Sequence, residues 1–396
     1  MPPPADQPLP TCRKRPLILV THEFFPHRGG IAVYAAEMAK AACAEGYAVE
    51  VWAPALPVDA TEPDWPFQVH RLNLAGDHSL ESQWRMAQHL RKNLPRLPES
   101  ILYIPEPGPL LALLLLQFFE HVHTAGLVIT FHGSEIQRLS ARRFLRWSTK
   151  HLLLRTARIG VVSEFAGQLL AKHFPVSAGK VVVTPGALRT DLTVPAAPPD
   201  RARHGRIVIL TVARLNPRKG QLQVIEALKR LPPAQQARLE YRLVGCHSKD
   251  NYETLLKTAA EDANFPVKFL GDIPDEKLGA VYADADIFAM TSMPHRQSVE
   301  GFGLVYLEAG AHGLPVVAHD IGGVAEAVLH GETGLLVAPG DTSALTAALA
   351  QLIDDAALRQ RLGAAGRARA RAHTWRDCAR ALFGPLPPPP PGPSAS

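Results

Sequence analysis

Short β-branched runs alternate with longer amphipathic stretches along most of this chain. In the first half, the runs are separated by helical stretches such as 31–45, 83–93 and 165–173. The strand candidates there are Leu17–Thr21, Ala48–Ala53, Val69–Leu72, Ile101–Ile104, Leu127–Phe131, Ile159–Ser163 and Val181–Thr184. This alternation predicts βαβ units, and therefore an α/β domain built on a parallel sheet.

The same pattern starts again after residues 193–206, TVPAAPPDRARHGR, whose Pro/Ala-rich composition predicts a linker. The second set of strand candidates is Ile207–Val212, Tyr241–Val244, Val267–Leu270, Asp286–Met290, Pro315–Ala318 and Gly334–Val337, with a final helix at Asp354–Phe383. We therefore expect two α/β domains, 16–192 and 207–383, between a disordered lead-in, 1–15, and a Pro-rich disordered tail, 384–396. Two facing domains of this kind place a ligand cleft between the carboxyl ends of their sheets.

Charge and composition exclude several classes of function. Among 396 residues, 42 Lys and Arg against 37 Asp and Glu give a net charge of +5, which does not indicate nucleic-acid binding. The cysteines lie far apart without metal-ligand spacing, which predicts reduced thiols in a cytoplasmic protein. The N-terminal residues lack the pattern of a signal peptide. The most apolar run, Leu110–Phe119, is shorter than the roughly 20 residues that span a bilayer, so it predicts a buried helix, and any membrane contact is expected to be peripheral.

The densest functional signal is Ser298–Gly310, SVEGFGLVYLEAG. Its glycines allow a tight backbone before a helix that begins near Leu304, and no Ser, Thr or Asp caps this helix start. Unpaired N–H groups and positive partial charge at such a start suit a diphosphate. Glu300 would then face the cleft, and Glu308 could hold a ribose diol. Spacing alone leaves open that both glutamates are merely solvated.

Three further segments follow strand candidates at the expected cleft. In VARLNPRKG, Arg214 and Lys219, with Arg218 as a weaker third member, could neutralise a diphosphate, although a solvent-exposed basic loop has the same composition. In FPHRGGIAV, Gly29 and Gly30 let the backbone approach a ligand, but the segment is not the GxGxxG of dehydrogenases. In TFHGSEI, His132 could contact a sugar or be purely structural.

Together these segments, with the GG loop and EGFGLVYLEAGAHGLPVVA in this order, resemble the retaining glycosyltransferases of family 4, which have the GT-B fold of two Rossmann-like domains. The resemblance runs from about Leu17 to about Asp354, and the spacing around SVEGFGLVYLE is similar to that of bacterial phosphatidylinositol mannosyltransferases. It implies that Arg214 and Lys219 hold the donor diphosphate, with the N–H groups of Gly303, Leu304 and Val305. It also implies that Glu300 and His132 lie at the donor sugar and that Glu308 binds the ribose.

The resemblance implies an enzyme that moves a sugar from a UDP- or GDP-sugar to a hydroxyl acceptor, a lipid or a glycan, without a metal or other cofactor. Base choice would depend on backbone contacts near Gly245 and Ile273. Two alternatives stay open: a phosphorylase-like enzyme, which needs a pyridoxal site and a longer chain, and a non-catalytic nucleotide-sugar-binding protein. Asp284 and Asp286 spell DxD but are assigned no metal, Glu106 is assigned a structural role, and His295 and Arg296 are possible sugar neighbours.

The segment Arg138–Arg155 carries basic residues at spacings of three to four, interleaved with Phe144, Trp147 and several leucines. As one helix it would gather the cations on a single face, which is typical of helices on anionic membranes. A solvated basic helix that packs its apolar side on the sheet explains the same pattern. The membrane hypothesis places the protein at the inner face of the membrane, where the segment presents an acceptor to His132.

Overall fold

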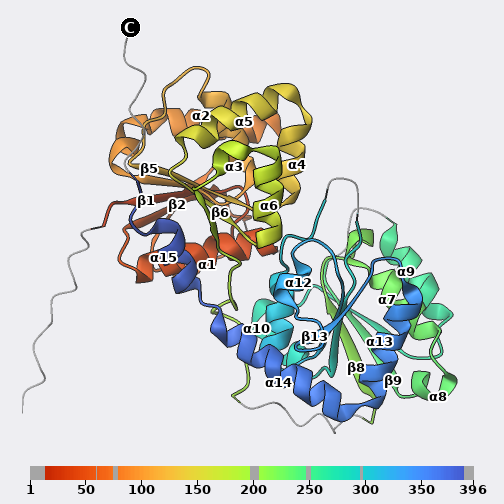
Figure 1. Cartoon of the computed structure of the whole chain (residues 1–396). Coiled ribbons are helices and arrows are strands. Elements are labelled where there is room, and N and C mark those ends of the chain that lie inside the picture. Colours follow the sequence, from red (N-terminus) through yellow and green to blue (C-terminus); the bar gives the residue numbers. More distant parts are fainter. Residues whose placement is uncertain are drawn as a thin grey trace, which may run out of the picture.

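The computed structural model describes residues 14–58, 60–74, 79–196, 205–246, 251–294 and 298–387. These residues form two α/β domains that face each other (Figure 1), which confirms the predicted fold class. Most of the predicted lead-in, linker and tail lies outside the described residues, as do His295 and Arg296.

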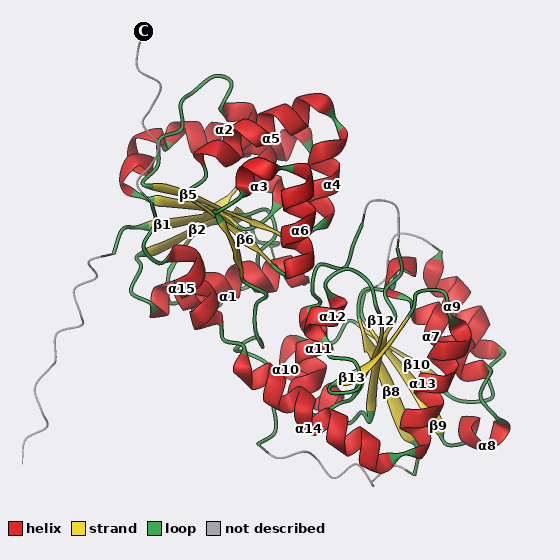
Figure 2. Ribbon diagram, viewed as in Figure 1, coloured by secondary structure: helices red, strands yellow, loops and turns green. Residues whose placement is uncertain are grey.

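The N-terminal domain is built on a parallel sheet in the order β3-β2-β1-β4-β5-β6-β7. Its strands are β1 (Leu17–Val20), β2 (Val49–Pro54), β3 (Gln68–Leu72), β4 (Ile101–Ile104), β5 (Gly126–Phe131), β6 (Arg158–Val161) and β7 (Val181–Val183). Its helices are α1 (Gly30–Ala44), α2 (Leu80–Lys92), α3 (Pro107–Leu116), α4 (Ser134–Ala141), α5 (Arg143–Arg155) and α6 (Glu164–His173). Figure 2 shows α1 on one face of the sheet and α2, α3 and α5 on the other. Helices on both faces explain why strands such as β1 and β4 are apolar and buried throughout.

The C-terminal domain repeats this plan with a parallel sheet in the order β10-β9-β8-β11-β12-β13. Its strands are β8 (Ile207–Val212), β9 (Leu239–Val244), β10 (Val267–Gly271), β11 (Ile287–Met290), β12 (Val316–His319) and β13 (Gly334–Val337). Its helices are α7 (Gln221–Lys229), α8 (Pro233–Gln236), α9 (Tyr252–Glu261), α10 (Asp275–Ala283), α11 (Leu304–Ala311), α12 (Val324–Ala327), α13 (Thr342–Asp354) and α14 (Ala356–Ala372). Every strand candidate of both halves is therefore confirmed, with ends that differ by at most two residues.

The predicted final helix, Asp354–Phe383, is wrong as one element. It is divided into α14 and α15 (Trp375–Phe383), because His373 and Thr374 are extended and the Thr374 hydroxyl caps α15 by accepting from the backbone N–H of Asp377. The second part returns to the N-terminal domain and packs on α1, as the blue ribbon in Figure 1 shows. The Trp375 indole donates to the carbonyl of Leu188 over 2.9 Å. By packing, α15 therefore belongs to the first domain rather than to the second.

Two further expectations about helices need correction. Arg142 adopts an extended conformation between α4 and α5, so the segment 138–155 is not one continuous helix. The apolar run 110–119 is also not buried to its end, because α3 stops at Leu116 and its last part reaches solvent. Phe118 and Phe119 are 42% and 79% exposed. No helix among the described residues is both long and apolar enough to span a membrane.

Candidate active site

The two domains enclose a cleft of about 1130 Å³. Its lining includes every residue that the sequence singled out as catalytic or donor-binding: Gly29, Gly30, His132, Arg214, Lys219, Gly245, Ile273, Glu300, Gly303, Leu304, Val305 and Glu308. The structure thus brings these residues together, while their individual roles stay predictions.

The topology of the two sheets explains this convergence. In the N-terminal sheet β1 lies between β2 and β4, and in the C-terminal sheet β8 lies between β9 and β11. The strand order reverses at these points, so the loops after the neighbouring strands run to opposite faces of the sheet and leave a crevice. Arg214 and Lys219 follow β8, Glu300 follows β11, and the Gly29 loop follows β1. The strongest predicted residues therefore lie at the switch points.

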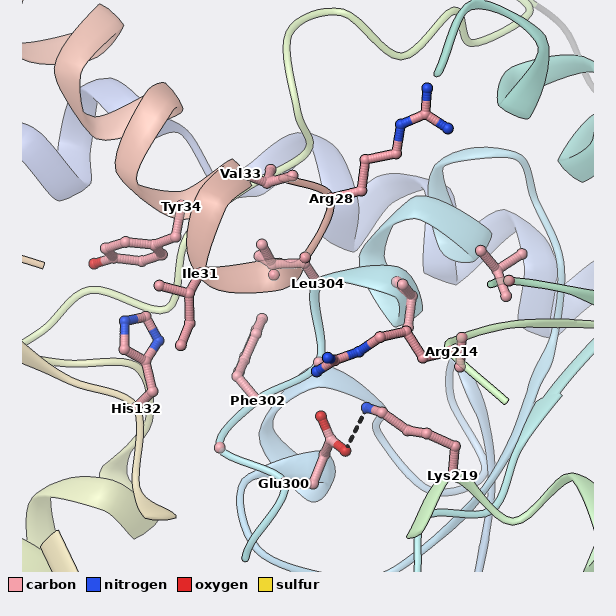
Figure 3. Close-up of a pocket in the computed structure, with 18 of the residues that line it drawn as sticks. Arg28, Ile31, Val33, Tyr34, His132, Arg214, Lys219, Glu300, Phe302 and Leu304 are labelled. Atoms are coloured by element: carbon pink, nitrogen blue, oxygen red, sulfur yellow. Dashed lines mark hydrogen bonds and ion pairs between the residues drawn. The ribbon is translucent and has the colours of Figure 1, made fainter. Parts of the chain in front are cut away.

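A cluster of charges surrounds the carboxylate of Glu300. Lys219 Nζ donates to Glu300 Oε2 over 2.8 Å, and Arg218 Nη1 lies 3.3 Å from the same oxygen. The Ser292 hydroxyl donates to it over 2.9 Å. The Lys219 and Glu300 side chains are only 16% and 10% exposed. Figure 3 shows this ion pair at the edge of the cleft.

These contacts keep Glu300 ionised. Burial alone would raise the pKa of its carboxyl, but Lys219 and Arg218 outweigh burial and lower it. All of the hydrogen bonds and ion pairs of this carboxylate within the described chain go to Oε2, which leaves Oε1 as an acceptor. A buried carboxylate with a spare oxygen suits the recognition of hydroxyl groups. Ser292 was missed in the sequence; it is buried behind Glu300 rather than lining the cleft, although its position just after β11 places it near the carboxyl end of the sheet.

Arg214 differs from its two cationic neighbours. Its side chain is exposed and extends into the cleft in Figure 3, toward the region of Phe302 and Glu300. In the part of the chain that the structure describes, its guanidinium forms no ion pair. A guanidinium that is exposed in the cleft next to Lys219 can bind a diphosphate through its forked N–H donors.

The start of α11 adds backbone donors to this cation cluster. Gly303 is the N-cap with a φ of +89°, and no side chain caps the helix. A Cβ at this position would lie 2.6 Å from the ring of Tyr306, so glycine is required both for the backbone and for the space. The N–H groups at the start of the helix, including those of Leu304 and Val305, line the same cleft as Arg214. This arrangement suits an anionic ligand.

Glu308 lies deeper in the cleft, within α11. The Tyr282 hydroxyl donates to Glu308 Oε2 over 2.8 Å. Burial raises the pKa of the Glu308 carboxyl, while Arg189 and the Tyr282 hydroxyl act in the opposite direction. Arg189 follows β7, lines the cleft and forms an ion pair with Asp275 at 2.9 Å. Sequence reasoning missed both Arg189 and Tyr282, because only the tertiary fold brings them to Glu308.

Gly245 and Ile273 follow β9 and β10 on the same side of the C-terminal domain. Gly245 has a φ of +145°, and a Cβ there would lie 2.0 Å from the carbonyl oxygen of Ala213. Its N–H donates to the carbonyl of Gly271 over 2.8 Å. Across the cleft, Arg28 Nη1 lies 3.1 Å from Asp272 Oδ2, next to Ile273. The loop after β1 therefore meets the loop after β10 at the cleft mouth.

His132 is held in a defined orientation at the other end of the cleft. Its Nε2 lies 2.8 Å from the carbonyl oxygen of Pro105, and since a carbonyl only accepts, this nitrogen carries the proton. The ring of Tyr34 meets the imidazole edge-to-face at 5.2 Å (Figure 3). The Tyr34 hydroxyl donates to the carbonyl of Thr184 over 2.9 Å. With the proton on Nε2, Nδ1 is the ring nitrogen that can accept a hydrogen bond.

The loop of His132 also contacts the loop of Glu300 directly, which the sequence did not show. The backbone N–H of Val299 donates to the Ser134 hydroxyl over 3.0 Å. A Cβ on Gly301 would lie 2.0 Å from the carbonyl oxygen of His132, so only glycine permits this approach. These contacts join the two domains at the floor of the cleft and fix His132 relative to Glu300.

The aspartates of the DxD sequence serve the fold. Arg242 Nη1 donates to Asp284 Oδ2 over 2.5 Å, and Asp286 Oδ2 accepts from the N–H of Val208 over 2.8 Å. Neither aspartate lines the cleft. Within the described ranges, no three or more His, Cys, Asp or Glu side chains are grouped to hold a metal ion. Glu106 has a structural role, as its carboxylate accepts from the N–H groups of His22 and Gly108 at 2.7 and 2.5 Å.

Comparisons with known families cover both domains. Residues 28–192 match the family described as Glycosyltransferase Family 4. Residues 197–369 match the family described as Glycosyl transferases group 1. The boundary between the two matches coincides with the connection between the two sheets.

Individual relatives match over nearly the whole chain. A GDP-mannose-dependent alpha-(1-6)-phosphatidylinositol monomannoside mannosyltransferase of Mycolicibacterium smegmatis is 31% identical, over 89% of this chain and 92% of the relative. A phosphatidyl-myo-inositol mannosyltransferase of Mycobacterium leprae is 28% identical, over 88% and 90%. Among solved structures, a sucrose-phosphate synthase of Thermosynechococcus elongatus matches with a TM-score of 0.75 at 22% identity, over 92% of this chain and 96% of that one. The similarity to the sucrose-phosphate synthase shows that the two proteins share the two-domain fold.

Proposed function

Because the chain belongs to glycosyltransferase family 4 and has the GT-B fold, we propose that this enzyme transfers a hexosyl unit from a nucleotide diphosphate sugar to a lipid hydroxyl, with retention of configuration. One observation carries the proposal. Arg214, which has no ion-pair partner among the described residues, lines one cleft together with Arg218, Lys219 and the uncapped start of α11. This is a site for a leaving diphosphate.

GDP-mannose is the donor that we propose. The relatives in Mycolicibacterium smegmatis and Mycobacterium tuberculosis are named as GDP-mannose-dependent mannosyltransferases. In this chain, the buried Glu308 would accept hydrogen bonds from the ribose diol, and the backbone near Gly245 and Ile273 would meet the base. Glu300 Oε1 would accept from hydroxyl groups of the mannosyl unit.

The chemistry needs no nucleophilic side chain. The bond between the anomeric carbon and the diphosphate oxygen breaks, and the acceptor oxygen bonds to the same carbon on the same face. The acceptor proton passes to the leaving diphosphate oxygen. Arg214, Lys219 and the N–H groups of α11 would stabilise the negative charge that develops there, so we propose that no metal is required. His132 Nδ1 would orient a sugar hydroxyl.

The acceptor that we propose is a phosphatidylinositol-type lipid, since the relatives' names specify such acceptors. The headgroup would enter the cleft from the N-terminal domain, beside His132 and Arg138, which both line it. A lipid acceptor requires contact with a bilayer. We therefore propose that the protein works as a peripheral protein at the cytoplasmic face of the membrane, with part of segment 138–155 as the contact.

The test combines ligand binding with product detection on the full chain. GDP, UDP and ADP are compared for their effect on the melting temperature, which a bound ligand raises by mass action. Transfer from GDP-mannose and UDP-glucose to phosphatidylinositol in mixed micelles is followed by mass spectrometry. We expect GDP to give the largest shift and GDP-mannose to give mannosylated lipid. Absence of both transfer and a nucleotide-induced shift would contradict the proposal.

A further inference from the structure

Exposed aromatic side chains from two helical regions of the N-terminal domain gather in one place. The ring of Phe118, just after α3, stacks on Phe144 of α5 at 5.3 Å and on Trp147 at 6.1 Å. These rings are 42%, 62% and 52% exposed. Two further apolar side chains lie at the same end of α3, Leu115 and Phe119, which are 40% and 79% exposed. Water is a poor environment for such a cluster, which indicates a surface that another phase or molecule covers.

Cations border these aromatic rings. Four exposed cations lie in α5 or directly before it, in the helix that carries Phe144 and Trp147: Arg142, Arg143, Arg146 and Lys150. No acidic residue occurs between residues 136 and 155. The nearby Glu120, after Phe119, is already paired with Arg91 at 2.8 Å. The positive charge of this surface is therefore not neutralised locally. We call these nine residues the aromatic–basic patch: Leu115, Phe118, Phe119, Arg142, Arg143, Phe144, Arg146, Trp147 and Lys150.

The aromatic–basic patch is continuous with the cleft. Arg138 lines the cleft and lies in the last turn of α4, and Arg142 connects α4 to α5. In Figure 1, α4 and α5 adjoin each other in the N-terminal domain. A molecule that leaves the patch therefore needs to pass only one short helix to reach the acceptor end of the cleft.

We infer that the aromatic–basic patch docks the enzyme on an anionic bilayer, with the rings of Phe118, Phe119, Phe144 and Trp147 at the level of the headgroups. This inference rests on the proposed lipid acceptor and names the surface that meets it. Amphipathic aromatic rings partition into the interface of a bilayer, and each nearby cation adds attraction to anionic lipids. Charge complementarity favours an anionic surface over a neutral one.

The first test is co-sedimentation of the full chain with vesicles of phosphatidylcholine alone and with phosphatidylglycerol added. We expect binding to the anionic vesicles at low salt and loss of binding at high salt. Arg142→Ser/Arg143→Ser/Arg146→Ser should lower the partition coefficient about a hundredfold. Leu255→Ser, at an apolar residue of α9 that is 50% exposed, is the control and should bind as the wild type does. Equal binding of the triple variant and the wild type would overturn the inference.

The second test uses Trp147 as a depth probe. Brominated lipids quench only tryptophans that reach the bilayer. Trp147→Phe should abolish this quenching, whereas Trp84→Phe, at an exposed tryptophan of α2, should preserve it. Quenching that Trp84→Phe abolishes and Trp147→Phe preserves would show that another face of the protein binds the bilayer. Binding to the vesicles without any quenching would equally contradict docking through the aromatic–basic patch.

Neither test requires a sugar donor, so the results of both are independent of whether the proposed reaction takes place. The triple variant should keep the wild-type melting temperature and transfer sugar normally to acceptor dispersed in detergent. Its transfer to acceptor in anionic vesicles should fall by at least tenfold. Loss of transfer to the dispersed acceptor would contradict the inference, because it would place these cations in the reaction itself.

Discussion

Lys219 Nζ donates a hydrogen bond to Glu300 Oε2 over 2.8 Å, and this ion pair joins the loop after β8 to the loop after β11. The two residues were expected to serve different parts of the donor. In the free enzyme, each instead neutralises the charge of the other, and both side chains are largely buried. Removing one partner of a buried ion pair leaves the other uncompensated, at a cost of about 3–5 kcal/mol. The predictions below follow from this arrangement.

Removal of either diphosphate-binding cation should slow the chemical step. Lys219→Ala and Arg214→Ala should each reduce kcat by about 100-fold or more, comparable with the loss of one oxyanion-hole donor. Arg230→Ala, at an exposed cation just after α7, is the control for general loss of charge and should leave kcat unchanged. Steady-state kinetics measure this, and near-normal turnover in both cleft variants would show that neither cation stabilises the leaving diphosphate.

Glu300→Gln should separate nucleotide binding from transfer. The substitution leaves Lys219 and Arg218 without their carboxylate, so the free protein should melt at a lower temperature. Affinity for free GDP should stay the same or rise, because the diphosphate replaces the missing negative charge, while transfer should fall. Glu226→Gln, in a surface pair with Lys229, is the matched control. Calorimetry checks the affinity, and a GDP affinity weakened tenfold in Glu300→Gln would argue against this split of roles.

The buried carboxylate of Glu308 should lower the stability of the free protein at high pH and strengthen its binding of the nucleotide. Burial raises the pKa of its carboxyl, so its contribution to stability is fully present below the unfolded pKa and is lost as pH rises through the higher folded pKa. At pH 8, Glu308→Gln should therefore melt no lower than the wild type when free of ligand. It should bind free GDP more weakly by about 1–3 kcal/mol, as a ribose hydrogen-bond pair is impaired. Melting curves of both proteins from pH 4 to 8, with and without GDP, measure the stability and the nucleotide binding. An unchanged GDP affinity of Glu308→Gln would exclude a ribose contact.

Chelation should leave the activity intact. Arg214, Lys219 and the start of α11 provide the positive charge that a metal ion supplies in other diphosphate sites. Transfer rates after EDTA treatment and gel filtration should equal those of the untreated enzyme. An activity that EDTA abolishes and Mg²⁺ or Mn²⁺ restores would contradict this.

Local sequence signals predicted the sheet strands and the residues that line the cleft. Arg214, Lys219 and Glu300 could be placed because each follows a strand, and the carboxyl ends of parallel strands meet at one edge of a sheet. Gly303 could be placed because a glycine before an uncapped helix start has a recognisable pattern. These inferences use only chain order and backbone geometry.

Contacts between distant segments could not be predicted in this way. The approach of Gly301 to the carbonyl of His132 depends on how the two domains meet. The return of α15 to α1 depends on the turn at Thr374, whose capping pattern with Asp377 was present in the sequence but was read as part of a helix. The exposure of Phe118 and Phe119 was also missed, because an apolar run does not reveal where its helix ends.

The anomeric configuration of the product tests the central claim most directly. The full chain is incubated with α-linked GDP-mannose and phosphatidylinositol, and the one-bond carbon–proton coupling at the new anomeric centre is measured by NMR. In the proposed reaction the acceptor oxygen attacks on the face from which the diphosphate leaves, while Arg214 and Lys219 stabilise the leaving group. The account therefore predicts an α-mannosyl product. A β-linked product would contradict the account.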